Sequence, residues 1–197
     1  TQVRPRTAML CILLILLPFW TSLLVRSYAW LVILQRRGPV NNLLLELGVI
    51  SEPLQLVHNL FGTIVGMVHI ALPFLVLPLY AAMRTIDRSL PMAAMSLGAT
   101  PSRAFWTTVM PLTLPALGTG TLLVYVYCLG FYIAPQILGG GRVNLLAMKA
   151  LETVNVYSDW GAASALGAVL LFSTLGIMLV IGWATQRIRK GMEPSHA

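Results

Sequence analysis

Four long apolar segments constrain the fold of this chain more than any other feature of its sequence. They cover approximately residues 8–25, 57–83, 105–135 and 160–186. A helix needs about 20 residues to cross a lipid bilayer, and each segment has about that length or more. Inside lipid every backbone N–H and C=O group has to be paired within its own segment, so each segment is expected to be helical. The sequence therefore predicts an all-α, polytopic membrane protein with four transmembrane helices.

The composition supports this class and excludes others. Only 10% of the 197 residues are charged, whereas 57% are hydrophobic. A soluble domain carries about 25% charged residues, so a soluble or disordered protein is excluded. The net charge of +7 would suit a nucleic-acid binder, but the charges lie in short clusters between the apolar segments and form no single basic patch. Membrane lipid, and not nucleic acid, is the expected surrounding.

The charges outside the apolar segments indicate which side of the membrane each loop faces. The stretches at residues 1–7, 35–56, 84–104, 136–159 and 187–197 hold 2, 2, 3, 2 and 3 bases, and carry net charges of +2, 0, +2, 0 and +2. Cytoplasmic loops of membrane proteins are enriched in Lys and Arg. Both chain ends and the loop at residues 84–104 are therefore predicted to lie in the cytoplasm.

The loop at residues 86–104 has the pattern of two short helices joined by a glycine turn. Asp87 or Ser89 can cap the first helix, and Gly98 can end it because glycine adopts a positive φ without strain. Thr100 and Pro101 then provide the cap and the first residue of a second helix. An ordinary loop at the membrane interface is the alternative interpretation of this pattern.

The stretch IDRSLPMAAMSLGATPSRAFWTTVMPLTLPAL at residues 86–117 resembles the EAA loop of inner-membrane permease subunits of ABC importers. The family pattern is Glu-Ala-Ala, three residues, Gly, nine residues and Ile-x-Leu-Pro, and this chain matches it at Ala93, Ala94, Gly98 and Pro111. It departs from the pattern at Met92, Thr108 and Met110, which replace the glutamate, the isoleucine and the leucine. The resemblance implies a loop that couples the permease to an ATPase. Because Met92 replaces the glutamate, the polar contact that the glutamate would make with the ATPase is not expected here.

Three further stretches are similar to the polyamine-type permeases of spermidine/putrescine importers. They are PFWTSLLVRSYAW at residues 18–30, LPFLVLPLYAAMRTID at 72–87 and PQILGGG at 135–141. The resemblance covers essentially the whole chain and implies a single permease domain over residues 1–197. The fold it implies is the MetI-like ABC permease core of six transmembrane helices, of which this chain would hold the last four, with two more upstream of Thr1.

The same resemblance implies a transporter subunit of the bacterial inner membrane that has three kinds of protein partner. They are a second homologous permease subunit, a dimer of a cytoplasmic ABC ATPase and a periplasmic solute-binding protein. ATP and Mg would be bound by the ATPase, so no cofactor is expected in this chain.

An intramembrane enzyme is the competing class of function. It would need a nucleophile with a base, or a set of metal ligands, facing each other within the membrane. The sequence contains no HExxH or GxSxG motif and no carboxylate in the four apolar segments, and its three histidines follow no metal-binding pattern. Neither catalytic residues nor a metal site is predicted. His69, within the second segment, is interpreted as hydrogen-bonded to a neighbouring helix, and a role in the translocation pathway is the alternative. Gly62 and Gly66 form a GxxxG pattern typical of helix packing.

Aromatic residues at the outer end of the third segment are candidates for the wall of a translocation pathway. Tyr125 and Tyr132 lie seven residues apart, which places them on one face of a continuous helix. Anchoring at the membrane interface is the alternative role of such residues. Relatives similar to this chain often have an aspartate just before the tyrosine, whereas here that position is Phe131.

The substrate implied by the resemblance is a polyamine, and aromatic faces attract such cations. Because no acid lies within the apolar segments, Asp159, next to Trp160, is the carboxylate expected to guide the cation. Glu152 is the other acid in that stretch, and the second permease would supply further charge. A neutral or zwitterionic solute, such as an opine or another amino-acid derivative, is the alternative substrate.

Overall fold

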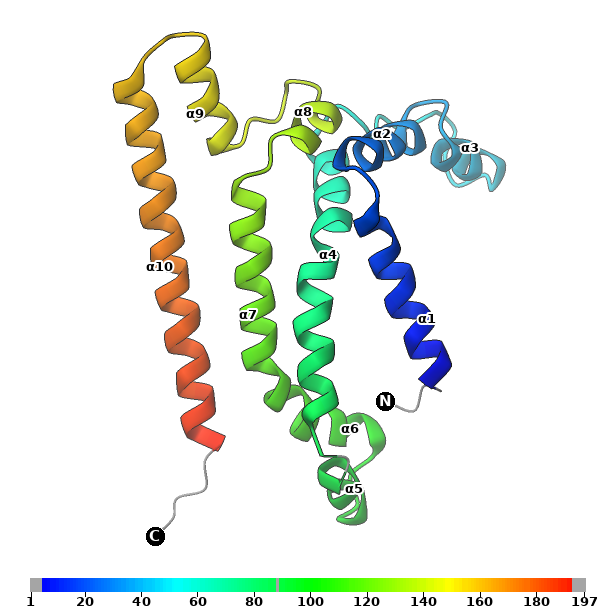
Figure 1. Ribbon diagram of the computed structural model, residues 1–197. Coiled ribbons are helices and arrows are strands. Elements are labelled where there is room, and N and C mark those ends of the chain that lie inside the picture. Colours follow the sequence, from blue (N-terminus) through cyan, green and yellow to red (C-terminus); the bar gives the residue numbers. More distant parts are fainter. Residues whose placement is uncertain (1–4, 88, 193–197) are drawn as a thin grey trace. The chain divides into compact units, whose positions relative to one another are not determined.

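The computed structural model of this chain describes residues 5–87 and 89–192, and within these ranges it contains helices but no strands (Figure 1). The helices are, in chain order, α1 (Pro5–Leu16), the 3₁₀ helix η1 (Leu17–Trp20), α2 (Leu23–Leu34), α3 (Pro39–Glu46), α4 (Leu60–Thr85), α5 (Ser89–Ser96), α6 (Pro101–Ala104), the π-helix η2 (Phe105–Val109), α7 (Met110–Leu129), α8 (Ile133–Gly139), α9 (Leu146–Asn155) and α10 (Trp160–Met192). The all-α fold class predicted from the sequence is confirmed.

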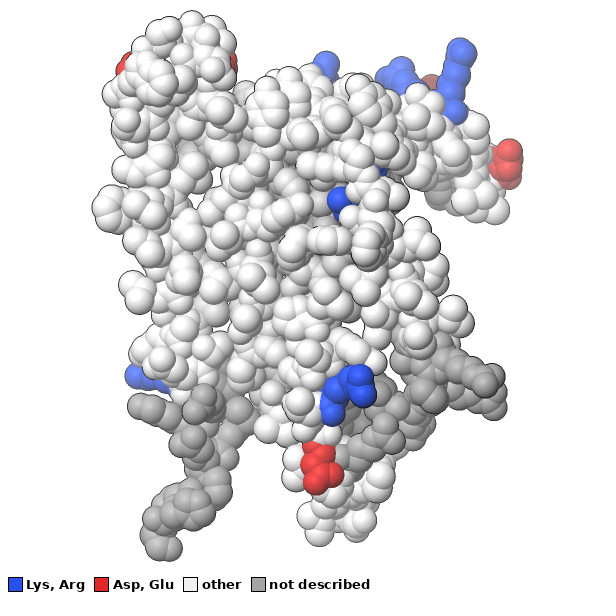
Figure 2. Space-filling view, viewed as in Figure 1, with Lys and Arg blue, Asp and Glu red and all other residues white. Residues whose placement is uncertain are grey.

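Three helical stretches of the described chain are, by length and composition, able to cross a membrane. They are Leu60–Thr85, Pro101–Leu129 and Trp160–Arg187, and they overlap the second, third and fourth predicted segments. Most of the surface visible in Figure 2 is uncharged, as a chain surrounded by lipid requires. A fourth span is possible only if the bent pair formed by Met9–Trp20 and Leu23–Glu46 is counted as one.

The first apolar segment does not form the single helix predicted at residues 8–25. Helix α1 passes into η1, which contains Pro18, and the backbone is extended at Thr21 before α2 begins. The two halves of the bent pair meet at 107°. Proline lacks the N–H that an α-helix needs, and the hydroxyl and the N–H of Thr21 both donate to the carbonyl of Pro18, at 2.7 and 3.0 Å. The chain therefore bends at Pro18, and the helix after the bend continues to Leu34.

The third apolar segment is interrupted as well, because α7 ends just before Gly130 and α8 is a separate short helix. In a continuous helix the ring of Pro135 would crowd the carbonyl of Phe131, and Gly130 would lie in the helix interior; both are unfavourable. Instead the N–H of Phe131 donates to the carbonyl of Cys128 at 3.2 Å, and Tyr132 occupies the N-cap of α8. The prediction of one helix over residues 105–135 is therefore wrong at its C-terminal end.

Four further prolines lie within the long helices, namely Pro73, Pro78, Pro111 and Pro115. Helix α4 continues through the first two, and α7 contains the other two. Just before Pro111 the helix widens to a π-turn, in which the N–H of Met110 donates to the carbonyl of Phe105. The wider turn accommodates a ring that would otherwise crowd the carbonyl four residues earlier.

The described residues fall into two compact units, where the sequence predicted a single domain over 1–197. The first unit comprises the chain up to Pro73 together with Tyr127–Leu170, and the second comprises Phe74–Val126 together with the chain from Leu171 onward. Helices α4, α7 and α10 contribute residues to both units.

In the first unit, α8 packs against α2 and α4. Leu138 of α8 is fully buried in a cluster with Leu34 and Val57, and its carbonyl accepts the N–H of His58 at 2.7 Å. Gly66 of α4 lies so close to Leu138 that a Cβ atom on the glycine would overlap Leu138 Cδ1. The close approach expected from the GxxxG pattern therefore exists, but its partner is a short helix.

His69 of α4 contacts an aromatic ring where a hydrogen bond was expected. Its Nδ1 is buried and has no hydrogen-bond partner among the described residues, and the same holds for Nε of Arg26. The imidazole instead meets Trp30 of α2 in a T-shaped contact, with ring centroids 5.6 Å apart and planes at 69°. The hydrogen bond predicted for His69 is thus not made through Nδ1.

In the second unit, glycines of α7 allow two neighbouring helices to approach its backbone. A Cβ atom on Gly118 would lie 2.9 Å from Thr185 Cγ2 of α10, and one on Gly120 would lie 3.0 Å from Leu75 Cδ1 of α4. These positions exclude larger side chains because the contacted atoms belong to packed helices. The second unit is therefore held together by close helix packing.

Candidate functional site

The loop between α4 and α7 forms the two short helices that its sequence predicts. Figure 1 shows α5 and α6 joining the end of α4 to η2 and α7. The carboxylate of Asp87 accepts the backbone N–H of Ser89 at 2.9 Å, so Asp87 is the residue that caps the start of α5. This hydrogen bond lowers the pKa of Asp87, because it stabilises the ionised carboxylate.

Helix α5 ends in a Schellman motif centred on Gly98. The N–H of Gly98 donates to the carbonyl of Met95 at 3.0 Å, and the N–H of Ala99 donates to the carbonyl of Ala94 at 3.1 Å. Gly98 has a φ of +91°, which side chains with a Cβ atom rarely adopt. A Cβ atom there would meet nothing within 4 Å, so the backbone conformation alone selects glycine.

The second helix of the loop begins at Thr100 and Pro101, as predicted. The hydroxyl of Thr100 accepts the N–H of Arg103 at 3.3 Å, and Pro101 stands in the first turn, where its missing N–H costs nothing. Helix α6 then runs without a break through η2 into α7, and Pro111 lies in the first turn of α7. The loop is thus continuous with a long apolar helix.

Helix α5 and its turn expose apolar side chains. Ala93 is exposed and Ala94 is half-buried. Larger apolar side chains beside them are exposed by 38–89%, namely Leu90, Met92, Met95 and Leu97. No acidic or basic residue lies between Ser89 and Ser96. The loop therefore offers a small, uncharged surface that another protein can cover.

The predicted pathway residues do not share one helix face. Because α7 ends at Leu129, Tyr132 belongs to the start of α8, and the spacing argument that paired it with Tyr125 is wrong. Tyr132 is 46% exposed, whereas Phe131 is buried with Ile70 and Ala134 and meets the ring of Tyr127 at 4.9 Å. Tyr125 is half-buried on α7 and belongs to the second unit.

Asp159 and Trp160 lie at the start of α10. The Asp159 carboxylate accepts the N–H of Ala162 at 2.9 Å, so it acts as a helix cap while remaining exposed. Trp160 is 70% exposed. These two side chains are therefore accessible, and Asp159 also has a structural role that the sequence analysis did not assign to it.

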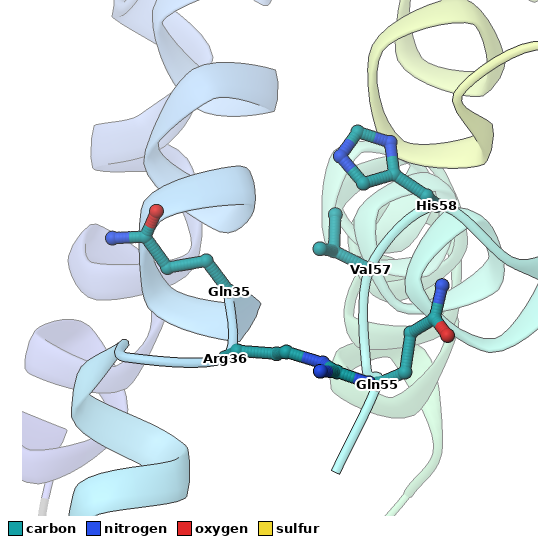
Figure 3. Close-up of a pocket in the computed structure, with 5 residues that line it drawn as sticks. All are labelled: Gln35, Arg36, Gln55, Val57 and His58. Atoms are coloured by element: carbon teal, nitrogen blue, oxygen red, sulfur yellow. The ribbon is translucent and has the colours of Figure 1, made fainter. Parts of the chain in front are cut away.

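Two cavities of the first unit involve residues that the sequence analysis missed. One, of about 330 Å³, lies between the end of α2 and the segment before α4 and is lined by Gln35, Arg36, Gln55, Val57 and His58 (Figure 3). Arg36 carries the one formal charge among these five side chains, so this cavity does not suit a cation.

The other cavity, of about 560 Å³, is lined by residues of α8, α9 and the chain that flanks them. Its polar side chains are Tyr132, Gln136, Asn144, Glu152 and Asn155. Of these, only Tyr132 had been predicted as a pathway residue. Glu152 and Asn155 are three residues apart, so the sequence could have placed them on one helix face. No sequence pattern indicated that Gln136 and Asn144 lie near them.

Comparison with known proteins identifies the family. Residues 6–190 match the family described as "Binding-protein-dependent transport system inner membrane component". Because the match covers nearly the whole chain, this chain belongs to that family of ABC transporter permeases. The resemblance inferred from its motifs is confirmed, and the family is one of transporters and not of enzymes.

Individual relatives agree with this assignment. The spermidine/putrescine transport system permease protein PotB of Haemophilus influenzae is 33% identical over 177 residues, which cover 89% of this chain and 62% of that protein. The protein of the same name from Escherichia coli is 35% identical over 191 residues, which cover 95% of this chain and 66% of that protein. The chain thus spans less than two thirds of the length of these relatives.

A solved structure shares the fold. A chain in the crystal structure of a bacterial ABC transporter involved in the import of the acidic polysaccharide alginate matches with a TM-score of 0.70. The match covers 95% of this chain and 68% of that one, at 17% sequence identity. The permease core predicted from the motifs is therefore confirmed as a fold.

Proposed function

We propose that this chain is a permease subunit of an ATP-driven importer and forms half of the translocation pathway for a polyamine such as putrescine or spermidine. The observation that carries the proposal is the 33–35% identity to permeases whose names specify these two amines, over 89–95% of this chain. The polyamine is a small organic cation, and the exposed aromatic rings of Tyr132 and Trp160 are groups that attract such cations.

The proposed partners follow from the family and from the exposed loop. A second homologous permease subunit would complete the pathway, and a periplasmic solute-binding protein would deliver the substrate. A dimer of a cytoplasmic ABC ATPase would bind ATP and Mg and would contact α5. Exposed apolar side chains on α5 support this contact, because the proposed orientation places α5 in the cytoplasm, where lipid does not cover such groups.

Each coupling residue has a distinct part in this proposal. Ala93 and Ala94 would let the ATPase approach the α5 backbone closely, and Gly98 would set the direction of the helix after the turn. Pro111 follows the π-turn through which α6 continues into α7. Movement of the ATPase would be passed along this continuous stretch to the pathway, for which Tyr125, Phe131, Tyr132, Asp159 and Trp160 are the proposed residues.

The proposed orientation places both ends of the chain and the loop at residues 84–104 in the cytoplasm. It rests on the distribution of bases along the sequence. In this orientation α3, α8 and α9 lie toward the periplasm.

The proposal is tested with the chain in complex with its second permease, its ATPase and its binding protein in proteoliposomes. ATP-dependent uptake of labelled putrescine is the expected result. Leu97→Asp, at an 89% exposed position beside the turn of α5, should release the ATPase during purification, since a carboxylate would be buried in the contact. Leu47→Asp is the matched control, because it occupies the same place before a glycine at the end of α3 and is 66% exposed.

Other results would overturn parts of the proposal. Retention of the ATPase by the Leu97→Asp complex would show that α5 is not its docking surface. Uptake of an amino-acid derivative, with no uptake of putrescine or spermidine, would replace the cationic substrate with a neutral or zwitterionic one.

A further inference from the structure

The cavity between α8 and α9 has the chemistry of a binding site for an ammonium group. Glu152 is the one ionisable acid among its lining residues, and none of them is a Lys, an Arg or a His. Oxygen atoms of Tyr132, Gln136, Asn144 and Asn155 add neutral hydrogen-bond acceptors. A primary ammonium has three N–H donors and no acceptor, so it fits a site that offers one carboxylate and several neutral oxygens.

The amide side chains of this cavity are available to a ligand. Within the described part of the chain, the side chains of Gln136, Asn144 and Asn155 make no hydrogen bond to protein groups. The thioether side chain of Met148 and the side chain of Leu151 add an apolar part to the lining. This combination suits an amine whose charged end is followed by methylene groups.

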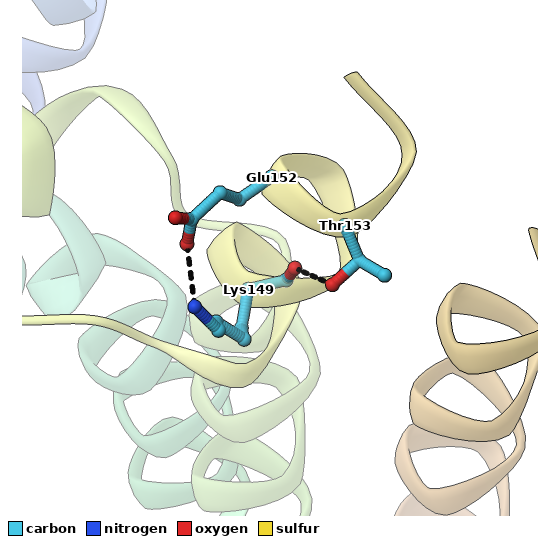
Figure 4. Close-up of polar contacts among 3 residues, drawn as sticks. All are labelled: Lys149, Glu152 and Thr153. Atoms are coloured by element: carbon cyan, nitrogen blue, oxygen red, sulfur yellow. Dashed lines mark hydrogen bonds and ion pairs between the residues drawn. The ribbon is translucent and has the colours of Figure 1, made fainter. Parts of the chain in front are cut away.

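An ammonium group of the chain itself already binds the Glu152 carboxylate. Lys149 Nζ lies 2.9 Å from Glu152 Oε2, with the two side chains 49% and 38% exposed (Figure 4). Lys149 does not line the cavity, whereas Glu152 does. The contact raises the pKa of Lys149, because the carboxylate stabilises the charged ammonium. Glu152 therefore already accepts a hydrogen bond from a primary ammonium group.

Helix α9 is fixed in a way that keeps Glu152 in the cavity wall. Met148 and Thr153 are its buried residues, exposed by 6% and 8%. The hydroxyl of Thr153 donates to the carbonyl of Lys149 at 2.7 Å, within the helix (Figure 4). Glu152 is next to Thr153 in sequence and is partly exposed, at the border between the buried side of α9 and solvent. Its carboxylate can therefore reach a ligand without a change in the helix.

We propose that this cavity binds one ammonium group of the transported amine, with Glu152 as its counter-charge and Lys149 as a competing ammonium that the substrate displaces. The inference rests on the proposed function, because it takes the substrate to be a polyamine. Among the residues of this site, the sequence predicted Tyr132 alone as a pathway residue and indicated Glu152 only as the second acid near Asp159. Displacement of Lys149 exchanges one ammonium for another, so the Glu152 carboxylate stays paired and the half-exposed Lys149 ammonium is released to water.

The test measures equilibrium binding of labelled putrescine to the assembled complex in lipid nanodiscs without the binding protein. Glu152→Gln should weaken binding about five- to ten-fold, the loss expected for a partly exposed charge-assisted hydrogen bond. Lys149→Met should strengthen it about two- to three-fold, because the competitor is gone. Glu46→Gln, the same change at an exposed acid of α3, is the matched control and should have no effect. Unlabelled putrescine should displace the label, whereas 1,4-butanediol, which lacks the charge, should not.

The outcomes separate this inference from the proposed function. Putrescine uptake by the complex, combined with equal binding by wild type and Glu152→Gln, would overturn the site and leave the importer assignment intact. Weaker binding in both Lys149→Met and Glu152→Gln would show that the ion pair is structural and would also overturn the site. A wild-type complex that neither binds nor imports putrescine would overturn both. Because an exposed ion pair adds little stability, the three variants should assemble as wild type does, and co-purification of the partners checks this.

Discussion

Gly66 of α4 lies directly against the fully buried side chain of Leu138 on α8, with no space for even one methyl group between them. Leu138 also packs with Leu34 and Val57, so it cannot move aside easily. Its carbonyl holds the backbone of His58, just before α4 begins. Leu138 therefore connects α8 with α2, with α4 and with the segment before α4. Loss of its contact with Gly66 should destabilise the first unit as a whole.

Gly66→Ala should destabilise the protein by about 1–3 kcal/mol, the range for an overpacked core. Leu138→Ala alone should also destabilise it, since it leaves a cavity. In the double variant the alanine at 66 fills part of that cavity, so the combined loss should be clearly smaller than the sum of the two. Thermal unfolding in detergent measures all three. Gly176→Ala, where a Cβ would meet nothing within 4 Å, is the control. Additive losses would show that the two residues do not share a contact.

Gly98→Val should abolish ATP-driven uptake while leaving the subunit in the membrane. A β-branched residue at a φ of +91° is strained, so the turn would open and α5 would be misdirected. Gly48→Val is a close control: Gly48 has a φ of +68°, open space around it and the same pair of carbonyl contacts at the end of α3. It imposes similar strain at a position outside the loop at residues 86–104. Equal loss of uptake in both variants would point to general instability.

The start of α5 should become more mobile at low pH. The hydrogen bond from the Ser89 N–H lowers the pKa of Asp87 below its ordinary value of 3.8. For a carboxyl group with a lowered pKa, the stabilisation is complete above the ordinary pKa and is lost as the pH falls through the folded value. Hydrogen exchange at Ser89, corrected for intrinsic rates, should therefore lose protection below about pH 4. Asp87→Asn, which keeps an acceptor oxygen but does not titrate, should remove this dependence; a dependence that persists would implicate another group.

The orientation is tested by single cysteines in a variant that lacks Cys11 and Cys128. Glu46→Cys, on α3, should react in intact cells with a thiol reagent that does not cross the membrane. Ser102→Cys, on α6, should react only after the cells are opened. Both positions are exposed in the structure, so a difference between them reports the side of the membrane and not burial. The reverse pattern of labelling would invert the topology.

The sequence alone determined the helical class and the two-helix form of the loop at residues 86–104, because both depend on local chemistry. An apolar run must pair its own backbone groups, and Asp87, Gly98 and Thr100 act on residues two to five positions away. Contacts between residues so close in sequence can be predicted from the local sequence. The family could likewise be identified from motifs whose spacing is intact.

Pro18, Gly130 and Pro135 mark the breaks in the apolar runs locally, but only the tertiary structure decided which residues meet once the runs break. The end of α7 at Leu129 separated Tyr132 from the helix face of Tyr125, and α8 packed against α2 and Gly66 instead of extending the third segment. The cavity that joins Gln136 to Glu152 depends on the same break, since it needs α8 and α9 to face each other. These contacts link residues far apart in sequence, and their free energy comes from burying surfaces against each other, which no local pattern encodes.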